Sequence, residues 1–304
     1  MYDIIIIGGG SAGLGAALIS ARNRFKTLLI DKGVELGHLG QTSQVSDIPG
    51  FEGTPSGIEV ANRLKKQILD LGGEIKQAAV TSCISQEGSK RIITNEPVNY
   101  DTKVVILATG NMPHQESHIY QGEKELRGKG ISHDAITDAP MCKRAAVAIV
   151  GKSQATAEAA IRLAQFAEKI YWVIPASKLE VPDNIGNELE KIKRIEYFYS
   201  SSLKKINGTN EVSSISFLSA GQEKMVSVKY VFLPPQPYKP VTDFLNGSGV
   251  QTNQDGVIMV NENFETSVKG IFAVGNILCL KPQLNIVCAA QGAIAALNSE
   301  NYLR

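Results

Sequence analysis

The chain opens with a short apolar run that is typical of a strand buried on both faces. Residues Tyr2 to Ile7 are mostly β-branched. A glycine turn and a helical pattern follow, and a second buried strand, Lys26 to Ile30, ends at Asp31. The pattern therefore predicts a βαβ unit at the start of the chain.

The next hundred residues alternate between helical and strand-like patterns. Apolar residues at three- and four-residue steps predict an amphipathic helix from Gly57 to Leu71. Strands are expected near 74–84 and 90–95, and a buried strand from Val104 to Ala108.

A second βαβ pattern begins near residue 145, with a strand to Val150, a turn at Gly151, a helix to Ala167 and a strand over 170–174. Meander-like strands are expected over about 195–233, and the proline-rich segment 234–240 is typical of a linker. Short strands over 256–260 and 270–274 and a final helix from about Leu284 complete the chain.

These two βαβ starts predict an α/β fold with two Rossmann-like domains, the second inserted into the first. A length of 304 residues suits two domains. Residues 1–113 and 245–304 would form the outer domain and residues 114–244 the inserted one, with linkers near 111–117 and 240–247.

Charge and hydropathy exclude some classes of partner. The formal net charge is +1 and 20% of residues are charged, so nothing suggests binding to nucleic acid or an anionic membrane. The longest apolar runs are too short to span a bilayer. The N-terminus lacks the pattern of a signal peptide, so we expect a cytoplasmic protein.

The cysteines do not form a recognisable metal site or redox pair. Cys83, Cys142, Cys279 and Cys288 are far apart in sequence, and no two are spaced as C-x-x-C. Four reduced thiols are the leading interpretation, with a long-range disulfide or one reactive thiol as alternatives.

The first glycine turn carries the strongest motif. Gly8-x-Gly10-x-x-Gly13 follows a strand, opens a helix and precedes Asp31 by 18 residues. In such a turn the glycines allow tight bending and close approach of a pyrophosphate, and the helix N-terminus attracts the phosphates. Asp31 is placed to accept hydrogen bonds from a ribose. The sequence therefore predicts a dinucleotide site.

Further motifs extend this prediction along the chain. The stretches IIGGGSAGLGAA (6–17), Gly40-Gln41, IPGF (48–51), ILATG (106–110), TSVKGIFAVGN (266–276) and AAQGAIAALNSENYL (289–303) resemble the low-molecular-weight thioredoxin reductases, in order and over nearly the whole chain. The resemblance implies a two-domain flavoprotein, with FAD in the outer domain, and a homodimer.

The resemblance also assigns roles to individual residues. It places Gly8, Gly10 and Gly13 at the FAD pyrophosphate, Asp31 at the ribose, Gln41 towards the flavin, and Thr109 and Gly110 where the chain leaves the domain. Neighbours of these residues are also expected to bind the cofactor: Ser11, Ala12, Lys32, Gly40 and Ala108.

Two residues of the implied FAD site differ from the family pattern. Asp47 takes the place of an asparagine near the isoalloxazine, and Asn276, after Gly275, takes the place of an acid at the ribityl chain. Cys288 and Ala289 lie where the last helix is expected to open towards the flavin pyrimidine and to stabilise reduced flavin.

The redox-active C-x-x-C of that family is absent here. The corresponding stretch runs from His133 to Asp138, with Asp134 and Thr137 in the places of the cysteines. Neither side chain can exchange disulfides. We therefore expect no ordinary disulfide relay, although Asp138 keeps the place of the acid that follows the pair.

The second glycine turn also departs from the pattern. Ser153 replaces the glycine that lets a backbone meet a pyrophosphate. After the next strand, Pro175 and small residues replace the expected arginines. We predict loss of ordinary NADPH binding, with a weakened or relocated nucleotide site, held by Lys152 and Lys178, as the alternative.

The sequence does not assign a catalytic residue. Cys288, with a pKa lowered by a helix N-terminus, and Cys142, as a displaced thiol, are weak candidates beside His133 and Asp138. For both cysteines we favour a structural role, and for His38 and His133 we favour that of an ordinary surface or loop residue.

Three functions remain open at this stage. The first is an FAD-dependent oxidoreductase whose electrons come from ferredoxin, flavodoxin or a second FAD in the inserted domain. The second is an NAD(P)H-dependent flavin reductase or oxidase with a weakened nucleotide site. The third is a flavin-binding sensor or interaction subunit without enzyme activity.

Overall fold

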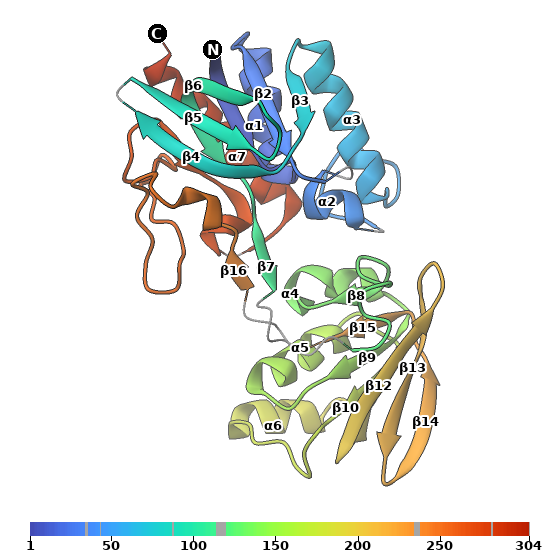
Figure 1. Ribbon diagram of the computed structural model, residues 1–304. Helices are drawn as coiled ribbons and strands as arrows, with labels where there is room; N and C mark the ends of the chain where they lie inside the picture. Colours follow the sequence, from blue (N-terminus) through green and yellow to red (C-terminus); the bar gives the residue numbers. More distant parts are fainter. Residues whose placement is uncertain are drawn as a thin grey trace. The chain divides into compact units, whose positions relative to one another are not determined.

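The computed structural model describes residues 1–33, 36–42, 44–86, 88–113, 120–233, 238–280 and 282–303. The chain forms two compact units (Figure 1). The first unit comprises residues 1–114 and 238–304, and the second comprises residues 115–237. An α/β architecture with parallel strand pairs in the sheets of both units confirms the predicted fold class.

A seven-stranded sheet forms the centre of the first unit. Its strand order is β3-β2-β1-β6-β5-β4, with β17 also paired to β6. The strands are β1 (Tyr2–Ile7), β2 (Thr27–Asp31), β3 (Glu74–Gln77), β4 (Val80–Gln86), β5 (Ser89–Thr94), β6 (Asn99–Leu107) and β17 (Ile271–Ala273). The expected strand over 74–84 is therefore two strands, because β3 pairs parallel to β2 while β4 pairs antiparallel to β5.

Helices α1 (Ser11–Arg22) and α7 (Asn285–Asn298) pack with their backbones in close approach. A Cβ atom on Gly292 would lie 2.0 Å from the Ala12 carbonyl oxygen, and one on Gly15 would lie 2.4 Å from the Ala289 carbonyl oxygen. These two glycines therefore set how near the helices come. Helices α2 (Gly37–Gln41) and α3 (Gly57–Asp70) and the 3₁₀ turns η2 (Asp243–Leu245), η3 (Gly275–Leu278) and η4 (Ser299–Tyr302) complete this unit.

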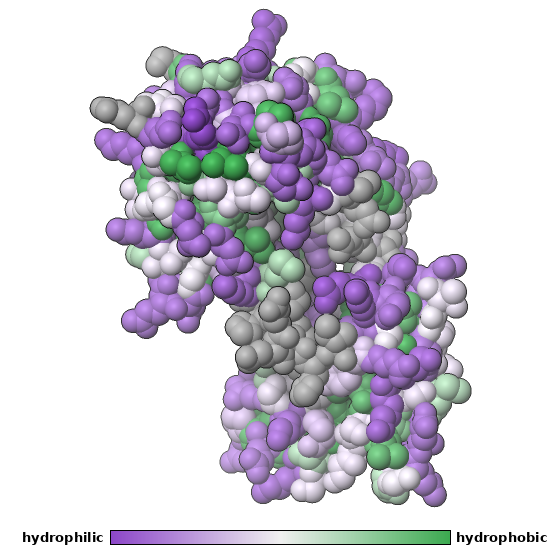
Figure 2. Space-filling model, viewed as in Figure 1, coloured by the Kyte–Doolittle hydropathy of each residue, from purple (hydrophilic) through white to green (hydrophobic). Residues whose placement is uncertain are grey.

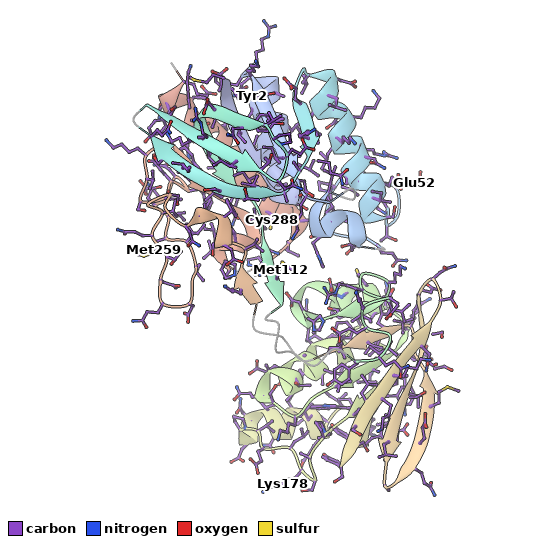
Figure 3. All side chains as sticks on the ribbon, in the orientation of Figure 1. Tyr2, Glu52, Met112, Lys178, Met259 and Cys288 are labelled. Carbon is purple, nitrogen blue, oxygen red and sulfur yellow. The ribbon has the colours of Figure 1, made fainter. Side chains whose placement is uncertain are left out.

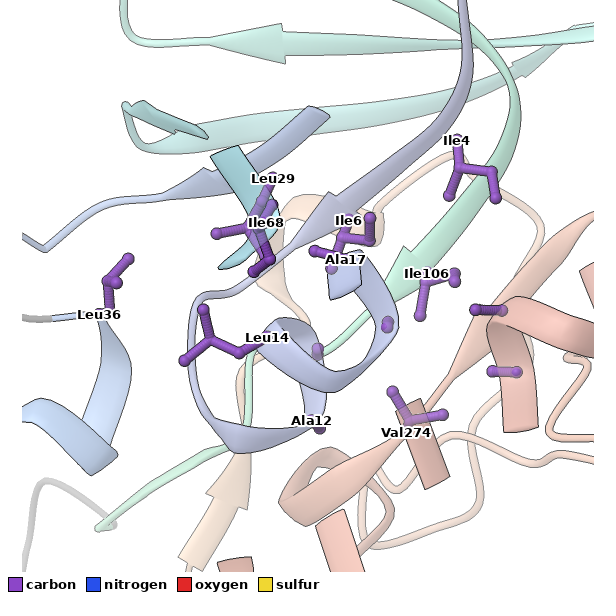
Figure 4. Packing of buried hydrophobic residues seen from close by; sticks show 14 of the residues in the cluster. Ile4, Ile6, Ala12, Leu14, Ala17, Leu29, Leu36, Ile68, Ile106 and Val274 are labelled. Carbon is purple, nitrogen blue, oxygen red and sulfur yellow. The ribbon is translucent and has the colours of Figure 1, made fainter. Parts of the chain in front are cut away.

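Aliphatic side chains fill the space between α1 and the sheet (Figure 4). Ile4, Ile6 and Ile106 come from the central strands, Leu14 from α1 and Ile68 from α3, and all five are fully buried. Burial of each such side chain contributes about 1.5–3 kcal/mol. This packing fixes α1 against β1 and so positions the turn between them.

The second unit contains a parallel sheet and an antiparallel one. The parallel sheet has the order β11-β10-β9-β15-β8, and the antiparallel sheet the order β12-β13-β14. The strands are β8 (Ile131–Ser132), β9 (Ala146–Val150), β10 (Lys169–Val173), β11 (Ile195–Phe198), β12 (Ser201–Gly208), β13 (Val212–Ser219), β14 (Gln222–Ser227) and β15 (Tyr230–Phe232). Helices α4 (Ala135–Asp138), α5 (Gln154–Ala164) and α6 (Asp183–Glu190) and the 3₁₀ turn η1 (Ala139–Cys142) accompany them.

Two expectations about irregular segments need correction. Residues 238–245 belong to the first unit and not to a linker, since β16 (Tyr238–Pro240) pairs with β7 (Asn111–Pro113) and Phe244 is buried. Residues 234–237 of the proline-rich segment lie outside the described residues. Residues 256–260 make only isolated bridges, because the Asn253 side chain accepts the backbone N–H groups of Asp255 and Val257 and turns the chain.

The surface is mostly polar on the visible face of each unit, with scattered apolar residues (Figure 2). Within the described ranges, no helix is long and apolar enough to cross a membrane.

Two glycine-to-alanine substitutions test the packing of α1 on α7. We expect Gly292→Ala to lower the free energy of unfolding by about 1–3 kcal/mol, because its Cβ would overlap the α1 backbone. Gly186→Ala in α6 is the matched control: its Cβ would meet no atom within 4 Å, and we expect a gain of about 0.5–1 kcal/mol.

Denaturation followed by two probes separates the units. Trp172, the one tryptophan, lies in the second unit, so its fluorescence reports that unit while far-UV circular dichroism reports both. An unchanged dichroism transition in the G292A variant would contradict the close-packing argument.

Candidate functional site

The glycines of the GxGxxG motif, two in the turn between β1 and α1 and one inside α1, differ in what a side chain there would meet. Gly8 has φ +107°, and its Cβ would lie 2.3 Å from the Ala108 carbonyl oxygen. A Cβ on Gly13 would lie 1.8 Å from the Gly8 carbonyl oxygen, whereas one on Gly10 would meet no atom within 4 Å. The open space at Gly10 is where a ligand can approach the backbone.

The N-terminus of α1 is free of a side-chain cap. Its N-cap residue is Gly10, and the first turn holds no acidic residue. Ser11 is buried, and its hydroxyl donates a hydrogen bond of 2.7 Å to Asn285 Oδ1 on α7. A helix start with unoccupied N–H groups and a positive dipole end suits a phosphate group.

Asp31 supports this turn from the end of β2. Its carboxylate accepts the Gly9 N–H at 2.6 Å and the Gly33 N–H at 2.7 Å. A carboxylate can accept about four hydrogen bonds, so acceptor capacity remains for a ribose hydroxyl. Lys32 is exposed beside it. The open space, the uncapped helix and this acid together fit a dinucleotide.

Asp47 lies at the start of α7. Its two oxygens accept the Asn285 backbone N–H at 2.5 Å and the Asn285 side-chain amide at 2.9 Å. Helix α7 therefore begins at Asn285, and Ala289 lies inside it and not at its opening as the sequence indicated. Asn285 was not among the site residues predicted from the sequence. The one indirect signal was its partner Ser11, which lies inside the GxGxxG motif.

Gly275, Asn276 and Cys288 meet behind this helix start. Gly275 has φ +77°, and its N–H donates to Gln291 Oε1 at 2.8 Å. The Cys288 thiol, labelled in Figure 3, donates to Asn276 Oδ1 at 3.4 Å. Burial, together with the charge of Asp47, raises the pKa of Cys288 to about 11. The alternative of a thiol activated by the helix N-terminus is therefore not supported, whereas the structural role that we favoured for Cys288 agrees with its burial.

The remaining residues of the predicted FAD site come from α2 and from the segment after β6. Gly40 and Gln41 end α2, and the side chain of Gln41 lies outside the described residues. Ala108 is buried behind Gly8, and the Thr109 hydroxyl donates to the Val241 carbonyl at 2.8 Å. Gly110 has φ +69° at the point where the chain turns into β7.

The second glycine turn is built differently from the first. Ser153 is the N-cap of α5, and its hydroxyl accepts the Thr156 N–H at 3.2 Å and lies 2.9 Å from the Thr156 hydroxyl. The Gly151 carbonyl accepts a hydrogen bond of 2.9 Å from the buried Trp172 indole. The helix start that could receive phosphate is thus occupied by the chain's own side chain.

The stretch that replaces the C-x-x-C is a short helix with no thiol in those places. Asp134 precedes α4, which ends at Asp138, and the side chain of Thr137 lies outside the described residues. His133 Nε2 lies 3.4 Å from Glu123 Oε1. Burial raises the pKa of Glu123, but its hydrogen bonds with His133 and the Tyr120 N–H leave the net pKa below its ordinary value.

His133 thus contacts Glu123, a partner that no sequence motif indicated.

The other cysteines are not activated thiols. Cys142 is fully buried, and burial, then the charge of Asp138, raises its pKa to about 12. Burial also raises the pKa of Cys83 to about 11 and that of Cys279 above its ordinary value. All four cysteines are free thiols. The proposal of Cys142 as a displaced redox thiol therefore receives no support from its surroundings.

Comparison with known proteins identifies the family of this chain. Residues 2–293 match the family described as pyridine nucleotide-disulphide oxidoreductase. A thioredoxin reductase of Aquifex aeolicus is 33% identical over 100% of this chain and 94% of its own.

Two solved structures are also similar. The thioredoxin reductase from Streptococcus pyogenes MGAS5005 has a TM-score of 0.88 at 27% identity, covering 100% of this chain and 98% of that one. A ferredoxin-flavin thioredoxin reductase from Clostridium acetobutylicum has a TM-score of 0.52 at 27% identity, covering 99% and 98%. Because the match covers nearly its whole length, the chain belongs to the pyridine nucleotide-disulphide oxidoreductase family and is an FAD-dependent oxidoreductase related to the thioredoxin reductases.

Proposed function

We propose that this enzyme passes electrons through FAD without a dithiol relay and without NADPH bound in the usual way. FAD, when bound, supplies the two-electron chemistry. The chain binds its pyrophosphate at Gly8, Gly10, Ser11, Ala12 and Gly13 and its ribose beside Asp31 and Lys32. Gly40, Gln41, Asp47, Ala108, Thr109, Gly110, Gly275, Asn276, Cys288 and Ala289 form the rest of the cofactor site.

The absence of a relay follows from the residues at the two cysteine places. Asp134 and Thr137 cannot form a disulfide. Cys142, the nearest thiol in sequence, is fully buried and has a raised pKa. An acceptor of electrons from this enzyme must therefore take them from the flavin itself.

The Ser153 cap is the observation that carries the second half of the proposal. In the first unit the N-cap of α1 is a glycine with no side chain, whereas in the second unit the Ser153 hydroxyl occupies the Thr156 N–H. A serine Cβ and hydroxyl at this place obstruct the close approach of a pyrophosphate. The position after β10 holds Pro175 and Ala176 and no arginine for a 2′-phosphate.

A small redox protein, ferredoxin or flavodoxin, is the donor that this arrangement favours. One of the similar solved proteins is named as a ferredoxin-flavin thioredoxin reductase, which supports a protein donor. A second FAD in the second unit is the other route without nicotinamide. Direct reduction of the flavin by NAD(P)H is the competing function.

We further propose that the enzyme is a homodimer and that it acts in the cytoplasm.

Gly10→Ala tests the cofactor site. The new Cβ would meet no protein atom, so we expect the variant to fold, with a loss of at most about 1 kcal/mol from the altered N-cap. It should nevertheless retain much less FAD, because the methyl group occupies the space of the pyrophosphate. Gly13→Ala is the contrasting variant, since its Cβ would overlap the Gly8 carbonyl and destabilise the unit itself. Full FAD occupancy in G10A protein would remove the proposed cradle.

An anaerobic titration followed at the flavin absorption band tests the donor. Flavin is first counted per chain, and NADPH, NADH and photoreduced ferredoxin or flavodoxin are then added separately. We expect prompt bleaching with a protein donor and slow bleaching with either nicotinamide. About two FAD per chain would favour the second-flavin route. Prompt bleaching by NADPH would overturn the proposal in favour of a nicotinamide-dependent flavin reductase.

Substitutions at Ser153 test whether the cap obstructs the second turn. Ser153→Gly removes both hydroxyl and Cβ and should accelerate reduction by NADPH, at a stability cost of only a few tenths of a kcal/mol, roughly. Ser153→Ala removes the cap but keeps the Cβ, so it should lose about 1 kcal/mol without the gain in rate. Equal rates in both variants and the wild type would show that Ser153 is not the obstacle.

A further inference from the structure

The first unit brings the starts of two helices together. Ser11 is the first residue of α1 and Asn285 the first residue of α7. The Ser11 hydroxyl donates to Asn285 Oδ1 at 2.7 Å, so the two N-termini are adjacent. A dinucleotide held at the start of α1 would therefore pass beside the start of α7.

The two helix starts differ in whether a carboxylate caps them. The first turn of α1 has a glycine N-cap and no acid. At α7, a carboxylate from outside the helix, that of Asp47, accepts both N–H groups that Asn285 offers it, at 2.5 and 2.9 Å. A charge-assisted cap of this kind cancels the positive field that a helix N-terminus otherwise projects.

The charge of Asp47 affects the pKa of the Cys288 thiol. Cys288 is the fourth residue of α7, where the helix dipole alone would favour a thiolate. Its pKa is instead raised to about 11, first by burial and then by the Asp47 charge. Asn276, which accepts the Cys288 thiol at 3.4 Å, is neutral. Asp47 is thus the acid of this cluster, and Cys288 stays protonated at neutral pH.

We propose that Asp47 is a positioning residue that lowers the reduction potential of the bound flavin by holding a fixed negative charge at the N-terminus of α7. Reduction adds two electrons to the flavin, and a nearby carboxylate opposes the added negative charge. The same charge favours uptake of a second proton with those electrons. This inference rests on the proposed FAD site and concerns its electrostatics.

The acid and the amide at positions 47 and 276 offer a charge-exchange experiment. Asp47→Asn removes the charge at nearly constant shape, Asp47→Glu keeps it, and Asn276→Asp adds a carboxylate beside Cys288. The double variant D47N/N276D moves the charge without changing the total. Asp101→Asn is the matched control, since Asp101 pairs with Arg91 at a partly exposed site on β6.

Each variant is purified with its flavin, and the flavin is equilibrated anaerobically against a reference dye between pH 7 and 8. We expect D47N to raise the ratio of reduced to oxidised flavin at a fixed dye potential about tenfold, or about 30 mV for a two-electron couple. Protons taken up with the two electrons should fall from about two towards about one. D47E and D101N should stay near the wild type, and N276D should shift the ratio in the opposite direction.

Unchanged potential and proton uptake in a D47N protein that keeps its flavin would overturn this inference and leave the proposed function intact. An equal shift in D47E would also overturn it, because the geometry and not the charge would then be responsible. Wild-type protein without any bound flavin would overturn both the inference and the function on which it rests.

Discussion

The site depends on how closely α1 approaches the elements around it. The Gly13 backbone packs against the Gly8 carbonyl, and Gly292 and Gly15 let α7 approach α1 until side chains are excluded between them. Because protein interiors are close-packed, these contacts leave little freedom for the helix to shift. The adjacency of Ser11 to Asn285, and hence the shape of the cofactor cradle, follows from this spacing.

Local patterns predicted the first βαβ unit because every signal there is short-range. The apolar strand, the glycine turn, the helix and Asp31 all lie within the first 31 residues, and each restricts the next. The pattern also predicted the second βαβ unit and the final helix. The strand predicted over 256–260 did not form. The Asn253 side chain accepts backbone N–H groups there and so competes with the hydrogen bonds of a β-sheet.

The contacts of Asn285 with Asp47 and Ser11 could not be predicted in the same way, because they join residues that are distant in sequence. Asp47 and Asn285 are separated by 238 residues, and Ser11 and Asn285 by 274. The local rule that a helix N-terminus lowers a thiol pKa therefore does not decide the pKa of Cys288. Burial and a carboxylate from another segment outweigh the dipole there.

The two glycine turns share a backbone plan but differ in how the following helix begins. Both turns follow a parallel strand, begin with a glycine of positive φ and open a helix. What differs is the residue at the N-cap: Gly10 leaves the first N–H groups to a ligand, while Ser153 satisfies one of them within the protein. A capping serine is among the best stabilisers of a helix start. Ser153 thus stabilises the start of α5 at the position where Gly10 leaves the start of α1 without a side-chain cap.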